Sequence, residues 1–586
     1  MQHDQNYASG KRRTYIFVVG GVMSGVGKGI ATASLGALIK ARGFRVTAVK
    51  IDPYLNVDPG TLNPVEHGEV FVTHDGLETD QDLGNYERFL NRDLGRLNCM
   101  TSGSVFQAVI ERERGLGYGG KTVEMVPHVP MEVISRIQNA SEKDDADVTL
   151  IEIGGTVGEY QNLLFLEACR MMRLENPGDV LVILVSYLPV PQTIGEMKTK
   201  PTQHASRMLN GAGLQPDILL CRSTHTIDEP RKRKLSISCN VATADVIAAP
   251  DVDSIYAVPI NFEKEGITDR ILDKLKLGSS RKTEEQETSK QISFRIGEPN
   301  DLSKETTASG LVTWEDLNER ILNGTSKTVR IGIVGKYFST GDFVLTDSYL
   351  SVLEAIKHAA WHLHARPEIV WLNSEQFEHA SGTGEIDSAL AELDGILIPG
   401  GFGTRGIEGK ISTIRYAREK KVPYLGLCYG MQLACLETAR HLAGLEDANS
   451  TEMNKETKNP VVHLMNEQEE RMRNVDYGGS MRLGSYPCHL KVESRAHTLY
   501  GADIVSERHR HRYELNPRYY DILQNHGLVI SGTSPNGELA EIVERADHPF
   551  FIATQFHPEF LSRPFHPHPL FVGFMESAIE KRYATA

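Results

Sequence analysis

The chain is 586 residues long, which is enough for about two or three domains with complete hydrophobic cores. Its 63 basic and 77 acidic side chains give a formal net charge of −14, so we expect no general affinity for nucleic acid or for an acidic membrane. The apolar runs, such as Val180–Val185, are too short to span a bilayer, and the basic N-terminus leads into a predicted strand without a signal segment. The seven cysteines lack zinc-site or disulfide spacing, which favours a reducing, cytoplasmic setting.

Over about the first 275 residues, short β-branched runs alternate with amphipathic stretches. This alternation is typical of a parallel sheet whose strands are joined by crossover helices. The predicted strands are Tyr15–Val19, Val46–Ile51, Val148–Ile153, Val180–Val185 and Pro216–Leu220.

Residues 278–310 are polar and mixed in charge, which predicts a linker. A second α/β pattern follows, with a predicted helix near Ser348–Leu363 and predicted strands at Val329–Val334, Gly395–Ile398, Val422–Leu427 and Phe550–Phe556. The sequence therefore predicts an α/β protein of two domains, residues 1–277 and residues 311–586, each a mostly parallel sheet flanked by helices.

A glycine-rich loop, Gly20–Gly29, follows the first predicted strand and precedes a predicted helix at Ile30–Ala41. Strand, glycine loop and helix in this order can cradle a phosphate, with backbone N–H groups facing the anion and Lys28 reaching its outer oxygens. The loop is not a strict Walker A motif, because the spacing before Gly27 is one residue longer and Gly29 stands where Ser or Thr is usual. A glycine-rich turn without a ligand is the alternative.

Without a loop hydroxyl, a Mg²⁺ ion bound with the phosphates needs oxygen ligands from elsewhere in the chain. Asp82 and Glu152 stand near predicted strand ends or in the adjoining loops, where the carboxylates of a parallel sheet can converge. By position alone, Asp82 and Glu152 are therefore candidate metal ligands. Solvated or helix-capping acids are the alternative.

The modified phosphate loop resembles that of the dethiobiotin-synthetase-like amidoligases. Three longer strings, Lys50–Gly60, His67–Val72 and Lys198–His204, resemble the CTP synthase family in particular. The resemblance implies Mg²⁺ at Asp82 and Glu152. It implies that ATP is bound by Gly25, Val26, Gly27, Lys28, Gly29, Ile30, Lys50, Asp82, Asp251 and Val252. It implies that UTP and CTP are bound by Ser24, Glu159, Tyr160, Gln161, Lys198, Thr199, Lys200, Pro201, Thr202, Gln203 and Lys234.

Lys198 and Lys200 alternate along a predicted extended segment, so both can face one triphosphate; a solvated edge is the alternative. The stretch Glu159-Tyr160-Gln161 departs from the family's Asp-Ile-Glu, and the neutral Gln161 leaves open how tightly the product CTP is held. Residues Gly115–Gly120 are also unusual, in a region that the family uses for contacts between subunits.

In the second domain, Cys428 stands between a predicted strand and a helix that we expect from Met431 to about Leu442. The sequence Gly-Leu-Cys-Tyr-Gly around it is typical of a nucleophile elbow, whose glycines allow a sharp turn and whose thiol lies at a helix N-terminus. His557 and Glu559 follow the last predicted strand, so His557 can act as the base and Glu559 can orient its imidazole. A small buried cysteine without chemistry is the alternative.

The glycine loop Pro399–Gly403 can supply a backbone N–H, with that of Tyr429, to a tetrahedral oxyanion. Together these motifs resemble the class I glutamine amidotransferases over residues 329–577. The resemblance implies thiolate attack on the glutamine carboxamide, release of ammonia and hydrolysis of a glutamyl thioester, catalysed by Cys428, His557 and Glu559. The implied glutamine-binding residues are Gly401, Tyr429, Gly430, Met431, Gln432, Glu452 and Arg512.

The two resemblances together imply one reaction, in which ATP phosphorylates the 4-oxygen of UTP and ammonia from L-glutamine displaces phosphate to give CTP. They also imply activation by GTP, feedback by CTP, and a homotetramer. An amidoligase for a carboxylate substrate is one alternative, and Lys198–His204 argues against it because a carboxylate needs no second triphosphate site. A non-catalytic ATP-binding switch or filament scaffold is another, and the intact Cys428, His557 and Glu559 set argues against it.

Overall fold

The computed structural model describes residues 11–584 except 22, 61, 63–67, 194, 279–313, 324–326, 337–338, 341–342, 345, 379–382 and 465–480. Nearly all of the predicted linker, and His67, therefore lie outside the described residues. Contacts divide the chain into two compact units: Met1–Asp58 with Asn85–Asn318, and Pro59–Gly84 with Glu319–Ala586. The segment Pro59–Gly84 thus belongs to the second unit, although the sequence analysis places it within residues 1–277.

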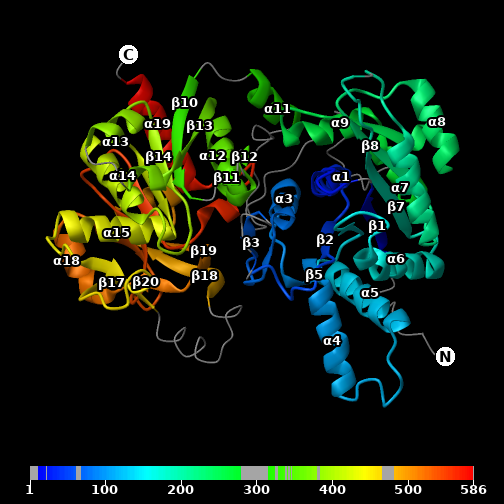
Figure 1. Ribbon diagram of the computed structural model, residues 1–586, viewed down its shortest axis with the longest axis horizontal. Coiled ribbons are helices and arrows are strands. Elements are labelled where there is room, and N and C mark those ends of the chain that lie inside the picture. Colours follow the sequence, from blue (N-terminus) through cyan, green and yellow to red (C-terminus); the bar gives the residue numbers. More distant parts are fainter. Residues whose placement is uncertain are drawn as a thin grey trace. The chain divides into compact units, whose positions relative to one another are not determined.

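The first unit is built on a seven-stranded parallel sheet (Figure 1). Its strand order is β5 (Cys99–Thr101), β2 (Val46–Asp52), β6 (Val148–Ile153), β1 (Thr14–Gly20), β7 (Val180–Tyr187), β8 (Ile218–Ser223) and β9 (Val246–Pro250). Every residue of β2 and β6 is buried, as expected for parallel strands covered on both faces. Strand β1 lies between β6 and β7. The chain continues from β1 to β2 on the β6 side and from β6 to β7 on the other side, so the direction of the connections reverses beside the loop that follows β1.

Helices connect these strands in the crossover pattern that the sequence predicts. They are α1 (Lys28–Ala41), α4 (Ser102–Arg114), α5 (Met125–Lys143), α6 (Leu163–Glu175), α7 (Lys200–Gly211), α8 (Glu229–Cys239), α9 (Val258–Lys264) and α10 (Ile267–Lys274). The boundary between the units falls within α3 (Gln81–Leu90) and α11 (Trp314–Asn323). The fully buried Trp314 packs against Phe89 and Tyr256, which anchors the start of α11 on the first unit.

The second unit is built on a nine-stranded mixed sheet. Its order is β13 (Ala365–Asn373), β10 (Lys327–Gly335), β14 (Gly395–Ile398), β15 (Tyr424–Leu427), β23 (Phe551–Thr554), β22 (Ala540–Glu544), β21 (Val529–Thr533), β18 (Arg482–Leu490) and β19 (Ile504–His511). The pairs from β13 to β23 are parallel, and those from β23 to β19 are antiparallel. The antiparallel strands β18, β19 and β22 carry buried charged residues, so hydrophobic runs do not mark them in the sequence.

Hydrophobic clusters fill both faces of this mixed sheet. On one face, Ile396 and Ile398 pack with α14 (Ile407–Lys420) and α15 (Tyr429–His441). On the other face, Leu397 packs with α12 (Leu350–His362) and α19 (Pro569–Tyr583). The remaining described elements include α13 (Thr383–Leu390), α17 (Arg495–Tyr500), α18 (Tyr520–Asn525), the sheet of β16 (Ala448–Ser450), β17 (Asn459–Leu464) and β20 (Tyr513–Leu515), and the hairpins β3 (Val70–Val72) with β4 (Glu78–Asp80) and β11 (Ser339–Thr340) with β12 (Phe343–Val344).

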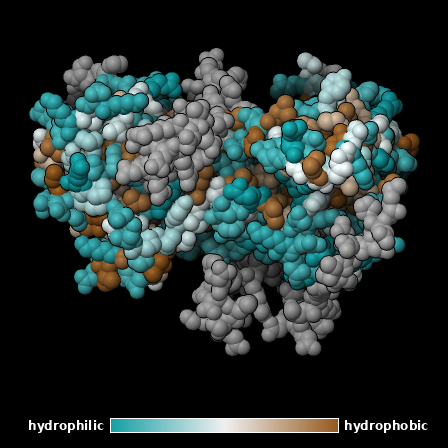
Figure 2. Space-filling view, turned by 90° about the horizontal axis from the view of Figure 1, so that it is seen from below, coloured by the Kyte–Doolittle hydropathy of each residue, from teal (hydrophilic) through white to brown (hydrophobic). Residues whose placement is uncertain are grey.

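The predicted α/β fold class is confirmed. The predicted strands Val148–Ile153 and Gly395–Ile398 coincide with β6 and β14, whereas the helices that follow the glycine-rich loop and the cysteine turn each begin two residues earlier than predicted, at Lys28 and Tyr429. On the face shown in Figure 2, most of the described surface is hydrophilic. Within the described part of the chain, no helix is long and apolar enough to cross a bilayer.

Candidate functional site

The chain turns sharply between β15 and α15, and Cys428 lies at this turn. Its backbone has φ 50° and ψ −96°, outside the helical region that begins at Tyr429. A Cβ atom added to Gly430 would lie 2.5 Å from the carbonyl oxygen of Ile398, so only glycine allows this close approach. This geometry is that of a nucleophile elbow, and it places the thiol at a helix N-terminus, where a thiolate is favoured.

The sulfur of Cys428 lies among polar groups. Gln555 Nε2 donates to Sγ at 3.7 Å, and Sγ lies 3.8 Å from the carbonyl oxygen of Arg510. Gln432 donates to Gln555 Oε1 at 3.3 Å and to the carbonyl oxygen of Tyr513 at 3.0 Å, which orients the Gln555 donor toward the sulfur. An N–H donor stabilises a thiolate relative to a thiol. The sequence analysis missed Gln555, although it belongs to the same short stretch as His557.

His557 and Glu559 are both buried after β23. The Nδ1 atom of His557 lies 2.7 Å from Glu559 Oε1, which orients the ring and leaves Nε2 for Cys428. Burial opposes protonation, but the charges of Glu559 and Cys428 and their hydrogen bonds raise the pKa of His557 to about 10. The imidazole is therefore protonated at neutral pH and can form an ion pair with a thiolate.

A cavity of about 310 Å³ lies beside Cys428. Burial raises the pKa of Glu452, against a 2.8 Å hydrogen bond from the Gly403 N–H and the charges of Lys336 and Arg512. An acid and an arginine on one cavity suit the ammonium and carboxylate of a free amino acid. The predicted residues that line this cavity are Gly401, Gln432, Glu452, Arg512, Cys428, His557 and Glu559. The other predicted glutamine-binding residues, buried in the first turn of α15, are Tyr429, Gly430 and Met431.

The segment Pro59–Gly84 also lines the cavity, through Gly60, Leu62, Glu69 and Val70. The carboxylate of Glu69 accepts hydrogen bonds from the Ser351 backbone N–H at 3.1 Å and 3.0 Å, at the start of α12. Such a carboxylate satisfies N–H groups that the helix itself cannot. The sequence analysis did not single out this contact.

In the first unit, the glycine-rich loop joins β1 to α1. Gly25 and Gly27 have left-handed φ angles of 70° and 91°. No described side chain caps the start of α1, and the N-terminus of a helix favours an anion. Lys28 is the first residue of α1, and its Nζ donates to the Gly155 carbonyl oxygen at 2.8 Å. The structure therefore brings Lys28 to the loop that follows β6, the strand that carries Glu152.

Glu152 and Lys50 are buried on neighbouring strands, with Lys50 Nζ 3.3 Å from Glu152 Oε1 and 3.7 Å from Asp52. The hydroxyl of Tyr86 donates to the other oxygen of Glu152. Asp82 lies in the first turn of α3, in the segment Pro59–Gly84 that belongs to the second unit. Among the described residues, no group of three or more His, Cys, Asp or Glu is arranged to hold a metal ion. A buried carboxylate such as Glu152 still fits Mg²⁺, which binds through one or two carboxylates together with waters and substrate phosphates.

A second cavity, of about 130 Å³, lies in the first unit beside the glycine-rich loop. Most of its other lining residues are apolar, which suits the flat face of a nucleotide base. Arg222 also lines it and donates from Nε to Asp251 at 3.0 Å; the sequence analysis missed this arginine. The predicted ATP-binding residues that line this cavity are Val26, Gly27, Ile30, Asp251 and Val252.

Two of the predicted triphosphate-binding lysines, Lys198 and Lys200, lie at the start of α7. The expectation of an extended segment is wrong at Lys200, which is the first residue of α7 and follows a helical Thr199. Pro201 explains the difference, because proline favours the first turn of a helix. Lys198 precedes the helix and lies 2.6 Å from Glu196.

Helix α8 adds cations near Glu196. Hydrogen bonding and charge from Lys198, with the charges of Arg231 and Lys234, lower the pKa of Glu196. The structure therefore gathers Lys198 and Lys234 around one acid, together with Arg231, which the sequence analysis did not single out. Of the other predicted nucleotide-binding residues, Ser24, Tyr160 and Gln161 are exposed, whereas Thr202 and Gln203 are buried.

The departing stretch Glu159-Tyr160-Gln161 forms a local hydrogen-bonded set. Thr156 donates to Glu159 Oε1 from its backbone N–H at 3.0 Å and its hydroxyl at 2.6 Å, and Gln161 Nε2 donates to Oε2 at 2.7 Å. Burial opposes ionisation, but these bonds and the charge of Lys28 lower the pKa of Glu159. Gln161 therefore supplies a donor that holds an ionised Glu159, which a carboxylate at position 161 cannot do.

Comparisons with known proteins match both halves of the chain. A family model described as CTP synthase N-terminus matches residues 14–277, and one described as Glutamine amidotransferase class-I matches residues 344–577. The chain is 48% identical over 573 residues to a CTP synthase of Trichormus variabilis, covering 98% of each chain. It is 46% identical over 566 residues to one of Nostoc punctiforme, covering 96% of each. Among solved structures, the glutaminase domain of Trypanosoma brucei CTPS with bound acivicin is 39% identical, with a TM-score of 0.40 over 44% of this chain and 95% of that one.

Replacing Glu559 by Gln removes the carboxylate charge that helps to raise the pKa of His557. We expect that pKa to fall, and because a neutral imidazole stabilises the thiolate less, the midpoint pH for alkylation of Cys428 should rise by about one to three units. The measurement is the rate of iodoacetamide alkylation across the neutral and alkaline range. Glu576→Gln, at an exposed position of α19, is the control. An unchanged midpoint in Glu559→Gln would contradict the role of Glu559.

Proposed function

The chain belongs to the CTP synthase family, and we propose that one compact unit hydrolyses glutamine and the other aminates UTP. The reaction consumes ATP and L-glutamine and converts UTP to CTP. The observation that carries the division of labour is the buried Cys428, His557 and Glu559 set beside a cavity that also holds Glu452 and Arg512. The first unit, by contrast, carries the phosphate loop and the base-sized cavity.

In the glutaminase step, the thiolate of Cys428 attacks the carboxamide carbon of glutamine. His557 gives its proton to the departing nitrogen, so ammonia leaves and a glutamyl thioester remains. The neutral His557 then takes a proton from the water that attacks the thioester, and glutamate leaves as the ion pair is restored. Backbone N–H groups at Tyr429 and in the loop at Gly401 stabilise the oxyanion of each tetrahedral intermediate.

In the amidoligase step, the 4-oxygen of UTP attacks the γ-phosphorus of ATP, and ADP leaves. Ammonia then adds to C4 and loses a proton, and the phosphorylated oxygen departs as phosphate, which gives CTP. Lys28, Lys50 and the N–H groups of the phosphate loop bind the ATP phosphates, and Asp251 and Val252 border its adenine. Asp82 and Glu152 would hold Mg²⁺, which neutralises phosphoryl charge when bound.

Lys198, Lys200 and Lys234 bind the triphosphate of UTP in this proposal, and Glu159 and Gln161 lie at its pyrimidine. The charges gathered around Glu196 support the first assignment, because a triphosphate can take the place of that acid as partner of the lysines. Activation by GTP, feedback by CTP, a homotetramer and a cytoplasmic location complete the proposal.

Replacing Cys428 by Ala should abolish CTP synthesis from glutamine and leave synthesis from ammonium largely intact. The reason is that only the release of ammonia needs a thiolate. The measurement is CTP formation with each nitrogen source, and Cys435→Ala, at a buried cysteine of the helix that follows Cys428, is the matched control. Equal loss with both nitrogen sources would contradict separate sites.

Asp82→Asn or Glu152→Gln should remove Mg²⁺- and ATP-dependent CTP formation while glutamine hydrolysis survives. Gly29 leaves no loop hydroxyl for the metal, so these carboxylates must supply the protein ligands. CTP formation and glutamate release are measured in parallel, with Glu175→Gln at an exposed site of α6 as the control. Near-normal CTP formation in both variants would place the metal elsewhere.

Gln161→Glu should tighten inhibition by CTP up to about tenfold, because a charged acceptor is worth roughly 1.5–3 kcal/mol against about 1 for a neutral one. The CTP amino group donates a hydrogen bond where UTP offers a carbonyl oxygen, so the apparent affinity for UTP should change less. The measurement is the inhibition constant for CTP at fixed UTP.

Gln161→Ala is the control for that experiment, because it removes the hydrogen bond to Glu159 without adding charge. An inhibition constant unchanged in Gln161→Glu, or tightened equally in Gln161→Ala, would refute the role of charge at position 161.

A further inference from the structure

Strand β19 carries alternating arginines and histidines, and its two faces meet different surroundings. Arg508 donates to the Val72 carbonyl oxygen at 3.0 Å, and Arg510 lies 2.8 Å from Glu78, so the arginines face the segment Pro59–Gly84. Since successive side chains of a strand point to opposite faces, His509 and His511 point into the interior, where both are buried.

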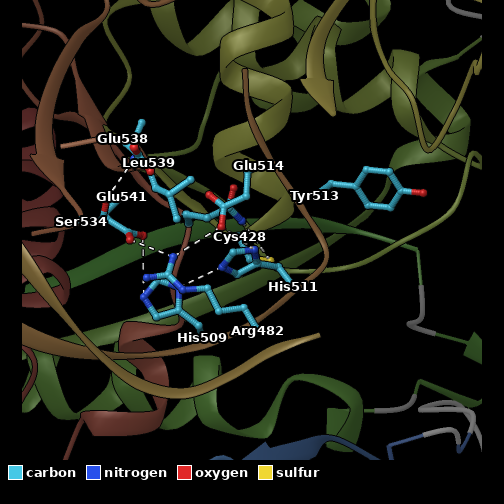
Figure 3. Close-up of polar contacts among 12 residues, drawn as sticks. Cys428, Arg482, His509, His511, Tyr513, Glu514, Ser534, Glu538, Leu539 and Glu541 are labelled. Atoms are coloured by element: carbon cyan, nitrogen blue, oxygen red, sulfur yellow. Dashed lines mark hydrogen bonds and ion pairs between the residues drawn. The ribbon is translucent and has the colours of Figure 1, made fainter. Parts of the chain in front are cut away.

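These histidines lie in a buried group of charged side chains (Figure 3). Arg482 of β18 reaches Glu541 of β22 at 2.9 Å and Glu514 of β20 at 3.4 Å. One cation and two carboxylates would leave a net negative charge out of contact with water, which is strongly unfavourable. One carboxyl group therefore keeps its proton, and the shorter contact to Arg482 identifies Glu541 as the ionised one.

The surroundings of each group agree with that assignment. Burial and the charge of Glu541 raise the pKa of Glu514 to about 8, against the influence of Arg482. Burial also raises the pKa of Glu541, which Arg482 opposes. Burial and the charge of Arg482 hold the pKa values of His509 and His511 well below the ordinary value, so both rings are neutral.

The neutral rings and the acids form a chain. His509 Nδ1 and His511 Nε2 are 2.9 Å apart, so one of them donates to the other. At the ends, His509 Nε2 lies 3.7 Å from Glu541 and His511 Nδ1 lies 3.6 Å from Glu514, a few tenths of an ångström longer than a hydrogen bond. Each neutral imidazole has a single N–H, so the position of the carboxyl proton, together with the backbone hydrogen bond between His511 and Tyr513, sets both tautomers.

We propose that Glu541, His509, His511 and Glu514 form a relay that holds one shared proton and sets the charge behind the nucleophile. With the proton on Glu514, its O–H faces the lone pair of His511 Nδ1, 3.6 Å away, and both histidines carry their hydrogen on Nε2. With the proton on Glu541, every donor reverses, and both histidines carry their hydrogen on Nδ1. In either state Arg482 faces one carboxylate, and the group is electrically neutral.

This relay bears on the glutaminase step because β19 lies beside the reacting pair. The Arg510 carbonyl oxygen lies 3.8 Å from Cys428 Sγ, and the Arg508 carbonyl oxygen accepts from the backbone N–H of His557 at 2.8 Å. The charge of His557 contributes to the low pKa values of both relay histidines. We therefore assign the relay residues a positioning role, which rests on the proposed function of Cys428. Within the described part of the chain, other titratable groups that act on or pack against the relay include Cys488 and Tyr486 of β18 and Tyr520 of α18.

The test is ¹⁵N NMR of the full chain labelled at histidine, which reports the tautomer of each ring. The variants are Glu514→Gln and Glu541→Gln, isosteric changes at buried carboxyl groups that both contact Arg482. In the wild type and in Glu514→Gln we expect hydrogen on Nε2 of both His509 and His511. In Glu541→Gln, Glu514 is the carboxylate that remains to balance Arg482, so it is ionised and accepts from His511. Both rings should then carry hydrogen on Nδ1. The same tautomers in both variants would overturn the relay.

A second measurement tests the link to the nucleophile. The double variant Glu514→Gln/Glu541→Gln leaves Arg482 without a carboxylate, and the added positive charge should lower the midpoint pH for iodoacetamide alkylation of Cys428 by about one unit relative to either single variant. Equal midpoints would overturn the positioning role.

The tautomer result does not depend on the chemistry of Cys428. Failure of the relay is therefore distinguishable from failure of the proposed glutaminase site. The single variants, which keep the group neutral, decide the relay even where the double variant does not fold.

Discussion

Both candidate sites depend on the abrupt turn that a buried parallel strand makes into the helix that follows it. Strands covered on both faces cannot shift without disturbing two hydrophobic layers, so the atoms at their carboxyl ends are held firmly. Lys28 begins α1 just after β1, and Cys428 precedes α15 just after β15. In each case a backbone that requires glycine, at Gly27 or Gly430, makes the turn possible. The backbone geometry of the turn therefore fixes where Lys28 and Cys428 lie.

Charge compensation is the second constraint, and the buried groups satisfy it in different ways. Lys50 and Glu152 neutralise one another across neighbouring strands. His557 and Glu559 compensate one another within a short turn. His557 stays protonated because the charges of both Glu559 and Cys428 raise its pKa. Lys410 shows the opposite outcome, because burial and the nearby charge of Lys336 lower the pKa of Lys410 to about 7.

The sequence predicted what depends on short motifs. Cys428, His557 and Glu559 were identifiable because a nucleophile elbow and a following His-x-Glu are local patterns. These three residues line one cavity with Gln432, Glu452 and Arg512 because of the order of the strands in the sheet. Hydrophobic periodicity does not give that order, and the sequence analysis took it from the resemblance to a known family.

What the sequence did not predict depends on contacts between distant residues. Arg482 of β18 contacts Glu541 of β22, which lies far along the chain. Both strands carry buried charged residues, so their sequences have the pattern of surface segments. Glu69 and Ser351 are 282 residues apart, and no local signal joins them. The prediction of an extended conformation at Lys200 was wrong for a different reason. The preference of Pro201 for the first turn of a helix outweighed the alternation of the lysines.

The membership of Pro59–Gly84 in the second unit has a consequence for how the chain is made. Val72 and Arg508 are separated by 436 residues, and Glu78 and Arg510 by 432, so these contacts have very high contact order. During translation, β3 and β4 are synthesised long before β19, which carries Arg508 and Arg510. Glu69 cannot contact the start of α12 until that helix has been synthesised. The second unit can reach its complete form only after residues as late as Phe560 have been translated, because its cavity is lined both by Gly60 and by residues about 500 positions later.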